Sequence, residues 1–171
     1  MSRPRLTETS YIVLGLIEYA EPATPYDLKQ LAQLSTMEFW TVPHTQLYTE
    51  CARLAKEGLL SEQREETGRR RRIYSLTKRG RQALKDWLAE PTGELDKVRD
   101  PATLKLFFGG DPAQLAAAQL AAHRRRLEAY EELRAGVTGI PSGMRLALQA
   151  GIGHEHEFIR FWSQVSELAP E

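Results

Sequence analysis

Four consecutive arginines, Arg69 to Arg72, stand directly before the apolar segment IYSLT. From Arg64 to Lys85 there are nine basic and two acidic residues, a local charge of +7 in a chain whose formal net charge is zero. Side chains alternate sides along a strand, so this run places guanidinium groups on both faces of a ribbon. Guanidinium binds phosphate bidentately, and neutralised phosphates release counterions. The run predicts contact with a DNA backbone; a solvated tip and an RNA-binding tract are the alternatives.

A helix predicted over residues 43–57 places a polar face beside this run. Its apolar side recurs at Leu47, Cys51 and Leu54, and Gly58 follows where helices commonly end. Polar side chains near the start of such a helix can read base edges, although a plain solvated face is the simpler alternative. For Arg53, a phosphate contact or a helix-surface charge is favoured over base reading. The predicted DNA contacts are His44, Thr45, Gln46, Tyr48, Thr49, Arg53, Arg69, Arg70, Arg71 and Arg72.

The elements that must position these residues have clear start signals. Thr7 and Thr24 are predicted N-caps of helices over about 7–20 and from Pro25 onward. After Gly58 the pattern changes to that of a two-stranded hairpin with a turn at Thr67-Gly68, and Thr77 caps a further helix that Pro91 ends. Three helices followed by a hairpin is the order of a winged helix-turn-helix, in which the third helix enters the major groove.

The second half of the chain is predicted to be helical and slightly acidic. After a linker at residues 91–99, Asp100-Pro101 and Asp111-Pro112 each begin a helix, and a last helix begins near Ser142. One short and two long helices cover their apolar faces poorly, so pairing with a second copy is expected. The predicted dimerisation residues are Leu120, Leu127, Leu148, Ile152, Ile159 and Trp162.

Composition excludes several other classes of protein. With 42% hydrophobic and 27% charged residues in 171, the chain is predicted to be folded and soluble. Its longest early apolar run, YIVLGLIEYA, is too short to span a bilayer and contains Glu18, so we expect a cytoplasmic protein without membrane contact. The single cysteine, Cys51, lies on an apolar helix side, where packing is favoured over redox chemistry.

Catalytic, metal and cofactor chemistry finds little support. His154 and His156 are two positions apart on a helix and point in nearly opposite directions, so a shared metal ion is not expected. Neither HExxH nor GxSxG occurs, and we predict neither an enzyme nor a cofactor. Trp40, Trp87 and Trp162 could line a pocket for a small planar hydrophobic effector, but core or dimer packing is the favoured use.

Four segments of the N-terminal half share one family pattern: LTETSYIVLGLI, TPYDLKQ, FWTVPHTQLYTECARLAKEGLL and RRIYSLTKRGRQALKDWL. In these segments the N-terminal half resembles the PadR family of winged-helix transcriptional regulators. ATLKLFF and the last helix resemble the longer C-terminal dimerisation domain of one PadR subgroup. The resemblance implies a homodimeric repressor or activator that binds an inverted-repeat operator, often with an inducer that acts through the dimer.

The sequence therefore predicts a mostly helical fold with a small β wing. Residues 1–90 would form the DNA-binding winged helix-turn-helix domain, and residues 91–171 the helical dimerisation domain. The predicted function is operator binding by a homodimeric repressor. A winged-helix module that binds protein or RNA without an operator is the alternative.

Overall fold

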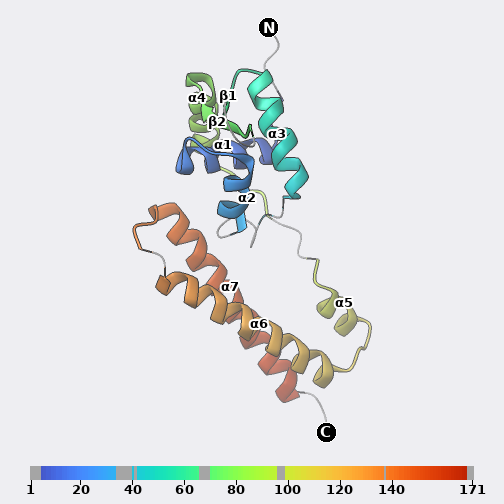
Figure 1. Ribbon diagram of the computed structural model, residues 1–171. Coiled ribbons are helices and arrows are strands. Elements are labelled where there is room, and N and C mark those ends of the chain that lie inside the picture. The colour runs from blue at the N-terminus through green and yellow to red at the C-terminus, as the bar shows by residue number, and fades with distance from the viewer. Residues whose placement is uncertain are drawn as a thin grey trace. The chain divides into compact units, whose positions relative to one another are not determined.

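The computed structural model describes residues 5–33, 40, 42–65, 70–95, 99–136 and 138–168. The chain divides into two compact units between Glu94 and Leu95. The N-terminal unit consists of α1 (Glu8–Ala20), α2 (Pro25–Gln33), α3 (His44–Lys56), β1 (Leu60–Arg64), β2 (Arg72–Leu76) and α4 (Lys78–Ala89), and the C-terminal unit of α5 (Pro101–Phe107), α6 (Pro112–Gly136) and α7 (Ser142–Leu168) (Figure 1). This architecture confirms the predicted mostly helical fold with a small β wing. The predicted turn at Thr67-Gly68 lies outside the described residues.

Local capping explains where the helices of the N-terminal unit begin. The Thr24 amide donates to Asp27 Oδ2 over 2.9 Å and the Asp27 amide donates to Thr24 Oγ1 over 3.3 Å, which satisfies two otherwise unpaired donors at the start of α2. Thr77 Oγ1 accepts a 3.1 Å bond from the Gly80 amide at the start of α4. These caps confirm the helix starts predicted at Thr24 and Thr77.

One apolar core holds the N-terminal unit together. Leu14, Ile17, Leu28 and Leu47, from the three helices, are completely buried in it together with Cys51. Burial raises the pKa of the Cys51 thiol to about 12, which leaves the unreactive thiol form at neutral pH. The third helix is therefore anchored along its whole apolar side.

The second strand of the hairpin, β2, packs against the same core. The strands pair antiparallel with Leu60 opposite Leu76, Glu62 opposite Tyr74 and Arg64 opposite Arg72. Tyr74 also exchanges two backbone hydrogen bonds with Ala23, of 2.8 and 3.0 Å, and its side chain is 1% exposed. Because the segment between α1 and α2 thus pairs with β2, the root of the wing is rigid.

The C-terminal unit is built on an antiparallel pair of long helices, α6 and α7, with α5 beside the start of α6 (Figure 1). Trp162 of α7 is completely buried against Ala102 and Ala116. A buried carboxylate also joins the helices: Glu155, 4% exposed, lies 2.6 Å from Nδ1 of His123 on α6. Among the described residues, no helix is both long and apolar enough to cross a membrane.

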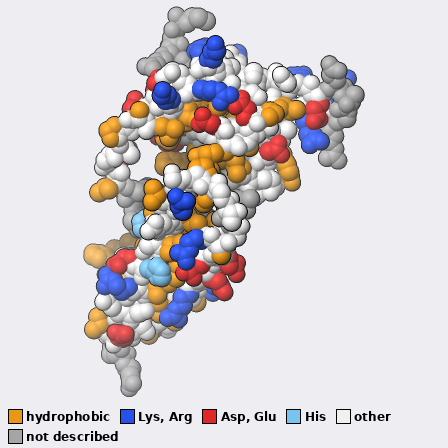
Figure 2. Space-filling view, turned by 90° about the vertical axis from the view of Figure 1, so that its left-hand side faces the viewer, with side chains coloured by type: hydrophobic (Ala, Val, Ile, Leu, Met, Phe, Trp, Pro, Cys, Tyr) orange, Lys and Arg blue, Asp and Glu red, His pale blue; other side chains and the backbone are white. Residues whose placement is uncertain are grey.

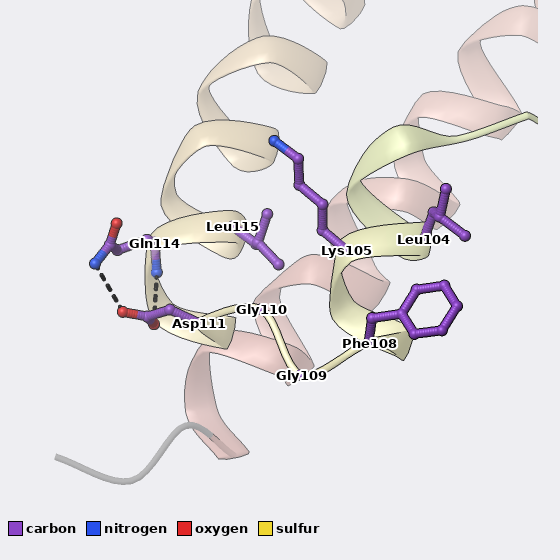
Figure 3. A pocket seen from close by; sticks show the side chains of 8 residues that line it. All are labelled: Leu104, Lys105, Phe108, Gly109, Gly110, Asp111, Gln114 and Leu115. Carbon is purple, nitrogen blue, oxygen red and sulfur yellow. Dashed lines mark hydrogen bonds between the residues drawn. The ribbon is translucent and has the colours of Figure 1, made fainter.

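A tight loop connects α5 to α6 (Figure 3). Gly109 has φ +85°, and the Gly110 amide donates to Lys105 O over 2.8 Å, so close that a Cβ on Gly110 would lie 2.9 Å from the same oxygen. Asp111 then caps α6, with its carboxylate accepting hydrogen bonds from the backbone and side chain of Gln114. The Phe108 ring points away from α6 and is 78% exposed.

Gly80 lies close to the backbone of Leu59 in the N-terminal unit, which leads to a stability prediction. A Cβ on Gly80 would lie 2.1 Å from Leu59 O and 3.3 Å from Leu76 Cδ2. Leu59 O also accepts hydrogen bonds from the amide and hydroxyl of Thr77, of 3.1 and 3.0 Å, so the Leu59 carbonyl cannot move away from α4 without breaking them. We therefore expect Gly80→Ala to lower the free energy of unfolding by about 3 kcal/mol. Urea unfolding followed by circular dichroism measures the change.

Gly15→Ala is the matched control in the same unit, because a Cβ there meets nothing within 4 Å inside helix α1. We expect this variant to gain about 1 kcal/mol from the higher helix propensity of alanine. Equal stability of the two variants would contradict the close packing of α4 on the hairpin.

Candidate nucleic-acid interface

The outer face of α3 presents a row of polar side chains. Leu47 and Leu54 are buried, so the same helix turns its opposite side outward. Thr49 Oγ1 donates to the backbone oxygens of Thr45 and Gln46, each over 3.1 Å, which directs its proton to its own helix and leaves its oxygen as an acceptor. The exposed members of this face are His44, Thr45, Gln46, Tyr48 and Thr49, all of them predicted contacts.

Arg53 instead makes its contacts within the chain. Its Nε donates to Glu50 over 2.9 Å and its Nη1 to Glu57 over 2.7 Å. Its Nη2 reaches Oγ of the buried Ser10 on α1 over 3.0 Å. Glu50 raises the pKa of Arg53, so the guanidinium stays charged but is flanked by two carboxylates. The geometry fits a brace between α3 and α1 better than a phosphate contact.

The wing arginines have acidic neighbours on the same hairpin. Arg71 lies 3.4 Å from Glu65, and Arg64 and Arg72 lie 3.1 and 3.7 Å from Glu62. These ion pairs are exposed and individually weak, and each guanidinium keeps further N–H groups for another partner. No ion pair is found for Arg70 within the described part of the wing, and Arg69 lies outside the described residues.

The hairpin alone has a smaller charge than the +7 counted from Arg64 to Lys85. Four basic residues of that count belong to α4, namely Lys78, Arg79, Arg81 and Lys85, and residues 60–76 carry five arginines and three glutamates. Figure 2 shows basic and acidic side chains interspersed on one face of the molecule. Sequence reasoning missed Glu62, which precedes the arginine-rich stretch. The strand register supplies the missing signal, since it places Glu62 on the same ribbon face as Arg64 and Arg72.

The predicted dimerisation residues differ in how far the single chain already buries them. Trp162 is 0% and Ile152 6% exposed, so both pack inside the C-terminal unit and we assign them to its interior. Leu120, Leu127, Leu148 and Ile159 are half-buried. Sequence reasoning did not select an exposed apolar group at the C-terminal end of α5: Leu104, Phe107 and Phe108, at 59%, 80% and 78%.

The three tryptophans, and the two histidines His154 and His156, lie in different surroundings. Trp87 stacks on Tyr11 with ring centroids 4.5 Å apart and lines a hollow between α1 and α4, whereas Trp162 is enclosed. Trp40 is 47% exposed. His154 and His156 are exposed, and the described residues contain no group of three or more metal-binding side chains.

The three-helix core, the fastened hairpin and the exposed polar face of the third helix define a winged-helix protein. Residues 13–86 match the transcriptional regulator PadR-like family, and residues 98–168 match the family described as virulence activator alpha C-term. The N-terminal half therefore matches a PadR-like transcriptional-regulator domain, and the second half fits the longer C-terminal helical region.

Known relatives agree with this assignment. The negative transcriptional regulator PadR of Bacillus subtilis is 31% identical over 100 residues, which are 57% of this chain and 54% of that protein. The match thus spans about half the length of this curated relative. Because this match is partial, the relative's activity and partners do not transfer to this chain directly.

Solved structures share the fold over nearly the whole chain. Bacillus subtilis PadR in complex with operator DNA has a TM-score of 0.81 at 22% identity and covers 93% of this chain and 97% of that one. The same protein in complex with p-coumaric acid has a TM-score of 0.75 at 23% identity, with 95% and 97% covered. A PadR-like regulator from Bacillus cereus has a TM-score of 0.75 at 19% identity, with 94% and 96% covered.

The brace between α3 and α1 predicts an acid-sensitive contribution to stability. Burial opposes ionisation of Glu50, but hydrogen bonds from Arg53 and Ser10 prevail and lower its pKa below the ordinary 4.5. The carboxylate therefore stabilises the fold above pH 4.5, and this contribution is lost as pH falls through the lowered pKa. We expect Glu50→Gln to cost about 1 kcal/mol at pH 7 and less at pH 3.5 in urea unfolding.

Glu18→Gln, on the exposed side of α1, removes the same charge away from the brace and should leave stability nearly unchanged at both pH values. A Glu50→Gln deficit that persists undiminished at pH 3.5 would contradict the lowered pKa.

Proposed function

We propose that this regulator is a homodimeric repressor that binds an inverted-repeat operator. The observation that carries the proposal is an exposed polar face on α3, anchored from behind by Leu47 and Leu54, on the same rigid core as an arginine-rich wing. In this arrangement α3 enters the major groove and the wing lies along the flanking phosphates. The name of the Bacillus subtilis relative and its complex with operator DNA support the proposal.

The proposed contacts divide by chemistry. Thr45, Gln46 and Thr49 carry side-chain groups that hydrogen-bond base edges, and His44 and Tyr48 flank them. The wing arginines, Arg69, Arg70, Arg71 and Arg72, contact phosphate and set affinity without reading sequence. Arg53 acts indirectly, because its brace to Ser10 sets the orientation of α3 on the core.

Dimerisation is assigned to residues 91–171, and DNA binding to residues 1–90. The half-buried Leu120, Leu127, Leu148 and Ile159, with the exposed rings of α5, supply apolar surface for a second copy. A twofold pair would present two α3 helices to major grooves about 34 Å apart. Such a regulator works in the cytoplasm, where its operator lies.

The effector part of the proposal rests on a small planar hydrophobic molecule. The complex of the Bacillus subtilis relative with p-coumaric acid supports it. In this chain, Trp87 is 39% exposed beside Tyr11, so an aromatic ring has a surface on which to stack. No cofactor or metal is part of the proposal.

The phosphate contacts predict a loss of affinity that is the same for every duplex. We expect the double variant Arg70→Ala, Arg72→Ala to weaken binding to its own promoter fragment and to a scrambled duplex alike, and to flatten the salt slope by about 1 to 2. Fluorescence anisotropy at several salt concentrations measures both. Arg99→Ala, Arg145→Ala removes equal charge from exposed positions of the other unit and is the matched control.

Base reading predicts a different outcome for Gln46. We expect Gln46→Ala to reduce affinity for the operator by about tenfold while binding to scrambled duplex stays unchanged, because a lost base contact costs about 1 to 3 kcal/mol. Footprinting followed by anisotropy on the protected site checks this. Preference for RNA or for no nucleic acid would favour the alternative module.

A further inference from the structure

The carboxylate of Glu62 contacts three side chains on one face of the wing. Glu62 Oε1 accepts a 3.1 Å hydrogen bond from Arg64 Nε, and Glu62 Oε2 accepts a 3.1 Å hydrogen bond from the Tyr74 hydroxyl. Arg72 Nη1 lies 3.7 Å from the same Oε2. A single side chain thus joins both strands of the hairpin.

The strand register explains why these groups meet. Facing pairs of an antiparallel ribbon share one face, and on this face the pairs are Leu60 with Leu76, Glu62 with Tyr74, and Arg64 with Arg72. The first pair and Tyr74 are buried, whereas the arginine side chains are 66% and 49% exposed. Glu62 therefore lies at the boundary between the core and the two guanidinium groups.

The contacts with Glu62 orient both arginines and leave each guanidinium with further N–H groups for another partner. Arg64 donates its Nε to Glu62 and keeps both terminal nitrogens, whereas Arg72 lies beside Glu62 through Nη1 and also interacts with the Tyr74 hydroxyl. Desolvation opposes the charge of Glu62, but Arg64, Tyr74 and Arg72 together lower its pKa. The anion is thus present at neutral pH and offsets one of the two positive charges.

We propose that Glu62 is a specificity-determining residue of the wing, which orients Arg64 and Arg72 for phosphates flanking the operator and weakens binding to other DNA. The inference rests on the proposed function. Binding to non-operator DNA is almost entirely electrostatic, so the negative charge of Glu62 reduces it directly. On the operator, α3 fixes the position of the wing. The oriented guanidinium groups then bind phosphates well enough to recover the affinity that the negative charge of Glu62 removes.

The test compares Glu62→Gln with the wild-type chain on its own promoter fragment and on a scrambled duplex, by anisotropy between 50 and 200 mM salt. Glutamine keeps the size and one acceptor oxygen but removes the charge and replaces the second oxygen with an NH2 donor. We expect affinity for the scrambled duplex to rise about threefold at the low-salt end, with a salt slope steeper by about 1, while operator affinity changes less. The ratio of operator affinity to scrambled-duplex affinity should therefore fall, by up to about threefold.

Two control variants separate charge from packing. Glu18→Gln makes the same charge change at an exposed position of α1 and should leave the ratio of the two affinities unaltered. Tyr74→Phe removes a bond to Glu62 but no charge, and should leave the salt slope unaltered even if stability falls. An unchanged ratio in Glu62→Gln, or equal weakening on both duplexes, overturns the inference.

The wild-type measurement keeps the two proposals distinguishable. A wild-type chain that prefers its promoter fragment, together with an unaltered Glu62→Gln ratio, overturns the role of Glu62 alone. A wild-type chain that does not distinguish the duplexes overturns operator binding, and one that binds neither overturns both.

Discussion

The attachment of the hairpin to the core through Tyr74 is the constraint on which the rest of the N-terminal unit depends. Its backbone pairs with Ala23, its ring is buried, and its hydroxyl reaches Glu62. A two-stranded hairpin alone is marginally stable in water. Because β2 is paired on both sides at its root, the arginines farther along extend from a fixed base, and the wing holds its position relative to α3 within the same unit.

The orientation of α3 depends on a second attachment of a different kind. Its apolar side packs against α1 and α2, but apolar packing alone tolerates small rotations of a helix. Hydrogen bonds from Arg53 to Ser10 and to two carboxylates are directional and fix that rotation. As a consequence, the two carboxylates offset the charge of the Arg53 guanidinium, which therefore offers no net positive charge to a phosphate. The polar face of α3 therefore gains a defined direction from a residue that need not touch DNA.

Capping shows how much of this fold the sequence could predict. Thr24 and Thr77 satisfy donors within three residues, so the local pattern predicted both helix starts. The succession of three helices and a hairpin predicted the winged-helix order. The partners of Arg53 and Glu62 could not be predicted in this way, since Ser10 is 43 positions from Arg53 and Glu62 meets Tyr74 only through the strand register. Trp162 was predicted as a dimerisation residue with core or dimer packing as its use, but only the packing of α5 shows that one chain encloses it.

Two kinds of contact join α6 and α7 in the C-terminal unit: apolar packing near α5 and a buried carboxylate farther along α6. Near α5 the helices meet through Trp162, whereas farther along α6 the buried Glu155 contacts His123, whose ring stacks on Phe158 with centroids 4.7 Å apart. Apolar side chains tolerate sliding between helices, but a buried carboxylate must keep its partner, because leaving it unpaired costs several kcal/mol. The Glu155 contact therefore selects one register for the α6–α7 pair. A unit proposed to set the spacing of two reading helices needs such a register, since a shift of one helical turn moves an attached surface by about 5.4 Å.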